Sequence, residues 1–197
     1  MSTTGAENTL PPGCPPPPAE NFWIFAYGSL IWDPGFPFEE ARPGLLRGWH
    51  RSFCLYSMRY RGTPDRPGLV LGLDRGGACR GIAYRVATQQ GEKVMAYLWE
   101  REMPNRVYAC RDVTVEIETG PITARTFVVR RDTSQYAGKL SLARTVDLIC
   151  QGHGQRGPCR TYLENTVRHL DKLGIPDGRL HALLRAVENR QDELTGG

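Results

Sequence analysis

The sequence predicts an α+β domain with a curled or closed β-sheet and a helical C-terminal third. Runs of aromatic and β-branched residues between glycine-rich turns, typical of buried strands, fill much of the chain between residues 22 and 129. One helical pattern interrupts these strands, and three further helical patterns follow residue 140. Strands that precede a block of helices, instead of alternating with them, favour the α+β class.

The first predicted strand covers residues 22–27 and ends at Gly28, where the chain turns. A second strand is expected over residues 69–73. The turn signal Asp-Arg-Gly-Gly at residues 74–77 then predicts a hairpin with a partner strand over residues 78–86.

A later hairpin is predicted from strict alternation. Apolar residues at 113, 115 and 117 alternate with polar ones, and Gly120-Pro121 turns the chain into a partner strand over residues 122–129. Helical spacing of apolar residues then predicts three helices in the last third of the chain. They cover residues 142–149, 159–173 and 180–187.

The composition is that of an ordinary soluble globular protein. Of the 197 residues, 40% are hydrophobic and 23% are charged. A chain of this length is long enough for one domain with a substantial core. The net charge of +4 comes from scattered Lys and Arg residues, so we expect no nucleic-acid partner. No apolar run is long enough to cross a bilayer, so we expect no membrane association. The sequence does not indicate an oligomeric state.

Residues 1–20 form a proline-rich stretch with little apolar surface to bury. Proline blocks helices and sheet ladders, and such segments cannot offset the entropy cost of ordering. We therefore expect a disordered tail over residues 1–20 and a single folded domain over residues 21–190.

The cysteines contain no Cys-x-x-Cys pair, and no apolar signal segment precedes them, so we expect reduced thiols in a cytoplasmic protein. Cys150, His153 and Cys159 resemble part of a metal site. Their spacing lacks a fourth thiol or imidazole, so we expect no metal. The six cysteines are Cys14, Cys54, Cys79, Cys110, Cys150 and Cys159.

Glu102 lies on the apolar face of a helix that Thr88 is predicted to cap. It follows Leu98 by four positions and Met95 by seven, so it shares their face. Glu100 falls on the opposite, solvent-facing side. An acidic side chain on the apolar stripe is the most informative residue of the sequence.

Pro104 disfavours helix at the preceding residue, so the helix is expected to end close to Glu102. Partial burial and the negative end of the helix dipole both raise the pKa of such a carboxyl towards neutrality, where it can accept and return a proton. The alternative is a structural ion pair with Arg101 or Arg106 at a frayed helix end.

The segment Tyr27-Gly28-Ser29-Leu30 follows the first predicted strand. A glycine just past a strand end lets the backbone turn sharply and exposes N–H groups that bind a carboxylate or a developing oxyanion. Ser29 lacks the glycine pattern of a nucleophile elbow, so we do not expect it to act as a nucleophile. By itself, Tyr27 is better explained as a core aromatic residue whose hydroxyl has a partner.

Residues 59–68 form a rigid, basic loop of sequence RYRGTPDRPG. An arginine fork in this loop could hold a substrate carboxylate. A solvated turn explains the same composition equally well.

Six segments, taken in this order, resemble the ChaC family of γ-glutamyl cyclotransferases, especially its bacterial branch. Each segment is weak by itself, but six in the family's order, spread over about residues 22 to 186, make a specific signal. They are FAYGSLIW at residues 25–32, YRGTP at 60–64, GIAYRV at 81–86, LWEREM at 98–103, QYAG at 135–138 and GPCRTYL at 157–163.

The resemblance implies a small mixed β-barrel flanked by helices and a catalytic acid/base at Glu102. Residues 103–107 form a longer loop than the Gly-Gly turn of eukaryotic relatives, which leaves the preferred leaving group open. The substrate-binding residues that the resemblance implies are Tyr27, Gly28, Ser29, Leu30, Ile31, Tyr108 and Tyr162, with Arg61 as a further candidate.

The activity implied is release of 5-oxoproline and cysteinylglycine from the small-molecule substrate glutathione. The α-amine of the γ-glutamyl unit attacks its own γ-carbonyl, so the nucleophile is intramolecular and we expect no cofactor. Two alternatives remain. The chain could act on other γ-glutamyl amines or dipeptides, or it could be a non-catalytic γ-glutamyl-binding regulatory protein.

Overall fold

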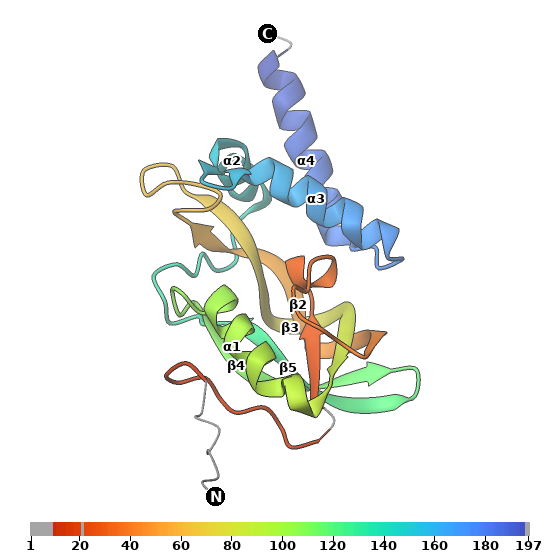
Figure 1. Ribbon diagram of the computed structural model, residues 1–197. Coiled ribbons are helices and arrows are strands. Elements are labelled where there is room, and N and C mark those ends of the chain that lie inside the picture. The colour runs from red at the N-terminus through yellow and green to blue at the C-terminus, as the bar shows by residue number, and fades with distance from the viewer. Residues whose placement is uncertain (1–9, 21, 196–197) are drawn as a thin grey trace, which may run out of the picture.

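A closed five-stranded barrel forms the centre of the computed structural model (Figure 1). The structure describes residues 10–20 and 22–195, apart from the side chains of residues 191–195. The strand order around the barrel is β1-β3-β2-β4-β5. Strand β1 pairs antiparallel with β3 and parallel with β5, which closes the sheet and confirms the predicted mixed barrel. The strands are β1 (Phe22–Ala26), β2 (Glu40–Ser57), β3 (Gly68–Val86), β4 (Tyr108–Ile117) and β5 (Gly120–Val129).

The long strands β2 and β3 differ from the prediction. The hairpin predicted across residues 74–77 is wrong, because these residues lie inside one continuous strand, Gly68–Val86. Gly76 and Gly77 have positive φ angles of 99° and 71°, and the register with β2 shifts opposite them. The glycines therefore form a bulge that bends the strand without reversing it. Strand β2 was not predicted, since charged residues and glycines interrupt its apolar alternation.

Four helices confirm the predicted helical segments. Helix α1 starts after a 3-10 turn, η2 (Thr88–Gln90), so Thr88 does not cap it as predicted, and Gln90 is the N-cap residue. Ser141 caps α2 by accepting a hydrogen bond from the Arg144 amide at 3.2 Å. The helices are α1 (Gly91–Glu102), α2 (Leu142–Gln151), α3 (Cys159–Lys172) and α4 (Gly178–Thr195).

The helices occupy two places around the barrel. Helix α1 is drawn over the barrel, whereas α2, α3 and α4 pack together at the upper end of the molecule (Figure 1). One apolar cluster joins barrel residues to all four helices. Within the described part of the chain, none of the helices has the length and apolar character needed to cross a membrane.

A small hairpin between α2 and α3, made of β6 (His153–Gly154) and β7 (Gly157–Pro158), holds the basic loop in place. The amides of Gln155 and Arg156 donate to the carbonyls of Arg59 and Tyr60, each at 2.9 Å. The glycines around β6 pack directly against this backbone.

The predicted N-terminal tail is described from residue 10, and residues 1–9 lie outside the described residues. Residues 10–20 form no helix or strand but contact the domain. The Arg125 guanidinium donates to the Pro16 carbonyl at 2.6 Å, and the Cys14 thiol lies 3.7 Å from the Met95 carbonyl. This part of the tail therefore runs along α1 and the barrel.

We expect Gly152→Ala to lower the free energy of unfolding by about 1–3 kcal/mol, the usual cost of overpacking. A Cβ atom at residue 152 would lie 2.5 Å from the Arg61 carbonyl oxygen and 2.6 Å from the Gly68 Cα, and backbone atoms cannot move aside freely. Gly178→Ala is the matched control, because a Cβ there meets nothing within 4 Å. Urea unfolding followed by circular dichroism measures both, and equal midpoints for Gly152→Ala and the unmodified chain would contradict this packing.

Candidate functional site

A cavity at the C-terminal end of β1 brings together segments that are far apart in the sequence. Strand β1, the turn after it, the last residue of α1, the start of β4, the middle of β5 and helix α3 all contribute to its wall. Its lining residues are Phe25, Tyr27, Gly28, Ser29, Leu30, Leu71, Glu102, Tyr108, Thr126, Phe127 and Tyr162.

The turn after β1 is a single 3-10 turn, η1 (Ser29–Ile31), with Gly28 at its N-cap position. The Ile31 amide donates to the Gly28 carbonyl at 2.9 Å. The Ser29 and Leu30 amides precede Ile31, whose amide is the first to donate within the turn, so they have no partner within it. The Tyr84 hydroxyl donates to the Ile31 carbonyl at 2.7 Å and fixes the turn to β3.

Glu102 closes α1 and faces the cavity. Val94, Met95 and Leu98 on the same face are buried, and Glu100 is exposed, as the helical spacing predicts. The Glu102 side chain keeps only 18% of its surface accessible. Burial raises the pKa of this carboxyl above its usual range, and the neighbouring Arg101 charge opposes that shift in part.

Arg101 connects the end of α1 to the turn after β1. Its guanidinium donates to the Ser29 hydroxyl at 3.1 Å, to the Asp33 carbonyl at 2.9 Å and to the Tyr97 hydroxyl at 2.8 Å. Its Nε lies 3.5 Å from Glu102 Oε1. The ion pair with Arg101, which the alternative interpretation of Glu102 predicted, is therefore present. The same carboxyl also faces the cavity.

Three tyrosines line the same cavity as the carboxyl. Burial raises the pKa values of Tyr27, Tyr108 and Tyr162, and the negative charge of Glu102 adds to each shift. The hydroxyls therefore stay protonated at neutral pH and can donate hydrogen bonds. The Tyr108 hydroxyl already donates to the Leu71 carbonyl at 2.8 Å, which holds its ring against β3.

A wider groove adjoins the cavity and carries a basic wall. The arginines at positions 59, 61 and 156 line it, and none of them has an ion-pair partner among the residues that the structure describes. Arg59 and Arg156 lie on the same aromatic ring, 5.5 and 4.7 Å from the Tyr60 centroid. The residues that line both cavity and groove are Ser29, Glu102, Tyr108 and Tyr162.

Arg61, a predicted binding residue, lies in the groove and not in the cavity. Its guanidinium donates to the backbone carbonyls of Arg156 and Pro158. It also stacks over the Tyr162 ring at 5.1 Å. The side chain therefore supports Tyr162, and its remaining donors face the groove.

Ile31, a predicted binding residue, is not among the residues that line the cavity or the groove. Its side chain is 4% exposed and belongs to the apolar core. The other predicted residues, Tyr27, Gly28, Ser29, Leu30, Tyr108, Tyr162 and Glu102, all line the cavity.

Sequence reasoning missed the lining residues on long strands. Leu71 lies in β3, and Thr126 and Phe127 lie in β5, where alternation marked them only as strand residues. The Thr126 hydroxyl donates to the Phe25 carbonyl at 2.8 Å and joins β5 to β1. Their place in the site follows from barrel closure, which no local pattern reveals.

The six cysteines are free thiols, all within the described residues. Cys159, one of the three residues considered for a metal, is buried, and its thiol donates to the Leu69 carbonyl at 2.9 Å. His153 is exposed in β6. Across the described residues there is no group of three or more His, Cys, Asp or Glu side chains that could hold a metal ion.

We expect Glu102→Gln to raise the melting temperature at pH 7, because it removes a buried charge. The native carboxyl has a raised pKa, so the folded chain binds its proton more tightly than the unfolded chain does, and stability falls as pH rises through that pKa. The difference in melting temperature between Glu102→Gln and the unmodified chain should be smaller near pH 4 than at pH 7, because the native carboxyl is more protonated there. A gain of about 1 kcal/mol corresponds to roughly 2–4 °C in a domain of this size. A melting temperature difference that does not change with pH would contradict the raised pKa.

Comparison with known proteins agrees with this geometry. Residues 22–190 match the protein family described as ChaC-like protein. The glutathione-specific gamma-glutamylcyclotransferase of Escherichia coli (strain K12) is 35% identical over 167 residues, which cover 84% of this chain and 72% of that protein. Glutathione-specific gamma-glutamylcyclotransferase 1 of Homo sapiens is 32% identical over 201 residues, covering 93% and 90%.

Solved structures show the same fold. The crystal structure of a gamma-glutamyl cyclotransferase specific to glutathione from yeast superimposes with a TM-score of 0.77 at 22% identity, and the match covers 86% of this chain and 96% of the yeast chain. The family match spans most of the chain, and the relatives from Escherichia coli and Homo sapiens both exceed 30% identity. The chain therefore belongs to the ChaC-like protein family.

Proposed function

We propose that the protein is a glutathione-specific γ-glutamylcyclotransferase, which converts its small-molecule substrate to 5-oxoproline and cysteinylglycine. The observation that carries this proposal is one shared cavity, in which a buried carboxyl with a raised pKa faces the Tyr27–Leu30 turn. The names of the Escherichia coli and human relatives support the substrate.

The reaction is an intramolecular substitution at the γ-carbonyl. The α-amine of the γ-glutamyl unit forms a C–N bond to this carbon, a five-membered ring closes, and the bond to the cysteine nitrogen breaks. Because both partners belong to one molecule, the protein supplies no nucleophile. It must hold the chain folded for attack, move protons and stabilise the tetrahedral oxyanion.

Glu102 is suited to both proton transfers. Ionised, it accepts a proton from the α-ammonium, and, protonated, it returns that proton to the departing amine. Burial raises the pKa of this carboxyl above its usual range, in the direction that favours general acid/base catalysis at neutral pH. Arg101, at 3.5 Å, limits the rise and so keeps the basic form available.

The turn after β1 and the tyrosines are suited to hold the substrate. Amides of Gly28, Ser29 and Leu30 lie at the cavity wall and offer donors for the oxyanion or the α-carboxylate. The protonated hydroxyls of Tyr27 and Tyr162 add further donors beside Glu102. These roles extend the prediction made from the sequence for the same residues.

The groove favours a leaving group that carries a carboxylate. The glycine carboxylate of glutathione lies about two residues beyond the γ-carbonyl, roughly 7 Å when extended. Arg59, Arg61 and Arg156 form a basic wall next to the cavity, where such an anion would enter. This charge favours cysteinylglycine over simple amines without a carboxylate, one of the two kinds of alternative leaving group. The amino acid released from a γ-glutamyl dipeptide also carries a carboxylate, so the charge does not select against it.

We expect Glu102→Gln to lower kcat for 5-oxoproline release from glutathione by at least ~100-fold, the usual share of a general acid/base. Glu100→Gln is the matched control, because it removes an exposed carboxyl of the same helix and should retain activity. Mass detection of 5-oxoproline and cysteinylglycine measures turnover, and circular dichroism checks the fold. Near-normal turnover by folded Glu102→Gln would exclude this role.

We expect the double variant Arg59→Gln, Arg156→Gln to raise KM for glutathione about 10-fold with little change in kcat. Loss of a charge-assisted hydrogen bond to the substrate weakens binding by about 1.5–3 kcal/mol. We expect the lower end of this range, because both arginines are exposed and solvent screens their charge. KM for γ-glutamyl-methylamide, which has no carboxylate on its leaving group, should not change. Arg144→Gln, an exposed arginine on α2, serves as the control. Equal effects on both substrates would exclude the groove as the carboxylate subsite.

A further inference from the structure

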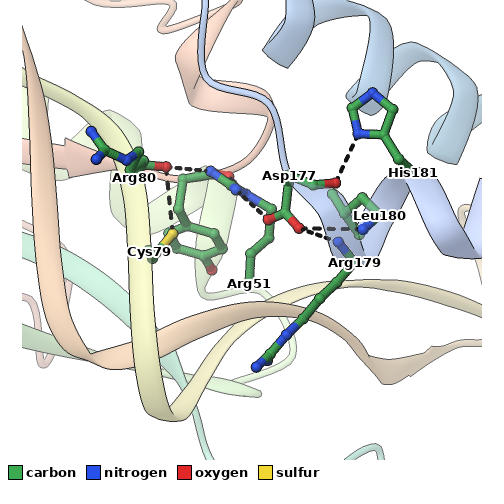
Figure 2. A network of polar contacts seen from close by, with 8 residues as sticks. Arg51, Cys79, Arg80, Asp177, Arg179, Leu180 and His181 are labelled. Carbon is green, nitrogen blue, oxygen red and sulfur yellow. Dashed lines mark hydrogen bonds and ion pairs between the residues drawn. The ribbon is translucent and has the colours of Figure 1, made fainter.

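Arg51 is a buried arginine that links the substrate-binding turn to the C-terminal helix. It lies in β2, and its side chain keeps only 2% of its surface accessible. Its Nε donates to the Tyr27 carbonyl, its Nη1 to Asp177 Oδ2 at 2.9 Å and its Nη2 to the Arg80 carbonyl at 2.7 Å. Figure 2 shows the guanidinium between Arg80 and Asp177.

The contact with the Tyr27 carbonyl controls the direction of the next amide. The Tyr27 carbonyl and the Gly28 N–H belong to one peptide group, which is planar and trans, so they point in opposite directions. Because Arg51 holds the carbonyl on one side, the Gly28 N–H must point to the other. Both residues line the cavity. A charged donor on the carbonyl also polarises the peptide group and strengthens its N–H as a donor.

We propose that Arg51 is a positioning residue for the cyclotransferase reaction: it fixes the Tyr27–Gly28 peptide so that the Gly28 amide points at the reacting γ-carbonyl oxygen. This inference rests on the proposed function. Asp177 acts through Arg51, because its carboxylate balances the buried positive charge and fixes the guanidinium plane.

Asp177 has a second task that joins this network to α4. Its Oδ1 accepts from the amides of Arg179 and Leu180 at 3.1 and 3.2 Å, which caps the helix. Its carbonyl lies 2.8 Å from His181 Nδ1. One carboxylate therefore connects the start of α4 to the turn at the cavity, and Figure 2 shows both sets of contacts.

Stability alone does not require this arrangement. A buried ion pair carries a desolvation cost that often cancels its attraction, and apolar residues of similar volume stabilise a core equally well. The nitrogens of this guanidinium donate to one carboxylate and to two backbone carbonyls, and one of these carbonyls belongs to the turn after β1. These three contacts fix the orientation of the Tyr27–Gly28 peptide.

Two variants test the proposal by kinetics. Arg51→Lys keeps the charge, but a single ammonium cannot serve three separated acceptors. Asp177→Asn keeps an oxygen that caps α4 and removes the charge that holds Arg51. For each variant we expect kcat with glutathione to fall ~10-fold or more. Complete loss of an oxyanion donor lowers kcat by ~100–1000-fold, and a misdirected donor should lose part of that effect. KM should change less than about 3-fold, since the lost interaction acts in the transition state.

The controls are Arg47→Lys and Glu116→Gln, which make the same chemical changes in an exposed ion pair between β2 and β4. Rates are measured well below each melting temperature and per folded molecule, so that reduced stability alone leaves kcat unchanged. Normal kcat in folded Arg51→Lys and Asp177→Asn would overturn the proposal. If Arg51→Lys does not fold, Asp177→Asn decides.

Amide NMR separates this proposal from the proposed function, because it needs no turnover. With 15N-glycine labelling, we expect the Gly28 amide resonance to shift in Asp177→Asn, whereas that of Gly120, in the distant β4–β5 turn, stays in place. An unchanged Gly28 resonance would overturn the proposal. A chain that releases no 5-oxoproline would refute the proposed function, while the Gly28 resonance would still test the link to Arg51.

Discussion

The protein depends on removing one carboxyl group, that of Glu102, from bulk water while its fold remains stable. Helix α1 achieves this by placing an acidic residue on the face that buries Val94, Met95 and Leu98. The apolar contacts of that face hold the helix against the barrel, and the carboxyl follows at its end. Desolvation then raises the pKa of the carboxyl, and the proposed function relies on this shift for proton transfer in both directions.

Three arginines make different contacts in and around the cavity. Arg101 contacts Glu102 directly and ties it to Ser29, so it limits the pKa shift and fixes the geometry together. Arg61 supports a tyrosine of the cavity through stacking. Arg51 reaches the cavity only through the backbone of the turn. Charged side chains thus contact aromatic and peptide groups, which line the cavity.

Much of the fold could be predicted from local patterns. The β4–β5 hairpin and the helices have clear periodicity and end at Gly or Pro, so physics within one segment determines them. Strand β2 has no such signal, because charged residues and glycines interrupt its apolar alternation and a bulge interrupts its register. The glycines at 76 and 77 resemble a hairpin turn, and only the pairing with β2 shows that they bend a continuous strand. Tertiary pairing overrode local turn chemistry there.

The candidate site was predictable where function places an unusual residue in a regular pattern. Glu102 interrupts an apolar stripe, and Gly28 follows a buried strand, so both are visible in the sequence. Arg51 and Arg101 are ordinary charged residues in sequence terms, and their importance comes from burial and from partners more than 20 residues away. Ile31 directly follows the cavity-lining residues Ser29 and Leu30 in the sequence, but its side chain is buried in the core and it does not line the cavity.

The parallel pairing of β1 with β5 has a consequence for how the molecule forms. It joins Ile24 to Arg125, so the first and last strands of the barrel meet only after about a hundred intervening residues have been arranged. Such non-local contacts raise contact order and slow folding, because the chain loses entropy before they can form. The pocket is built from both strands, so it comes into existence late, when the sheet has closed on itself. A nascent chain would therefore lack the complete cavity until the whole barrel and Tyr162 of α3 had been synthesised.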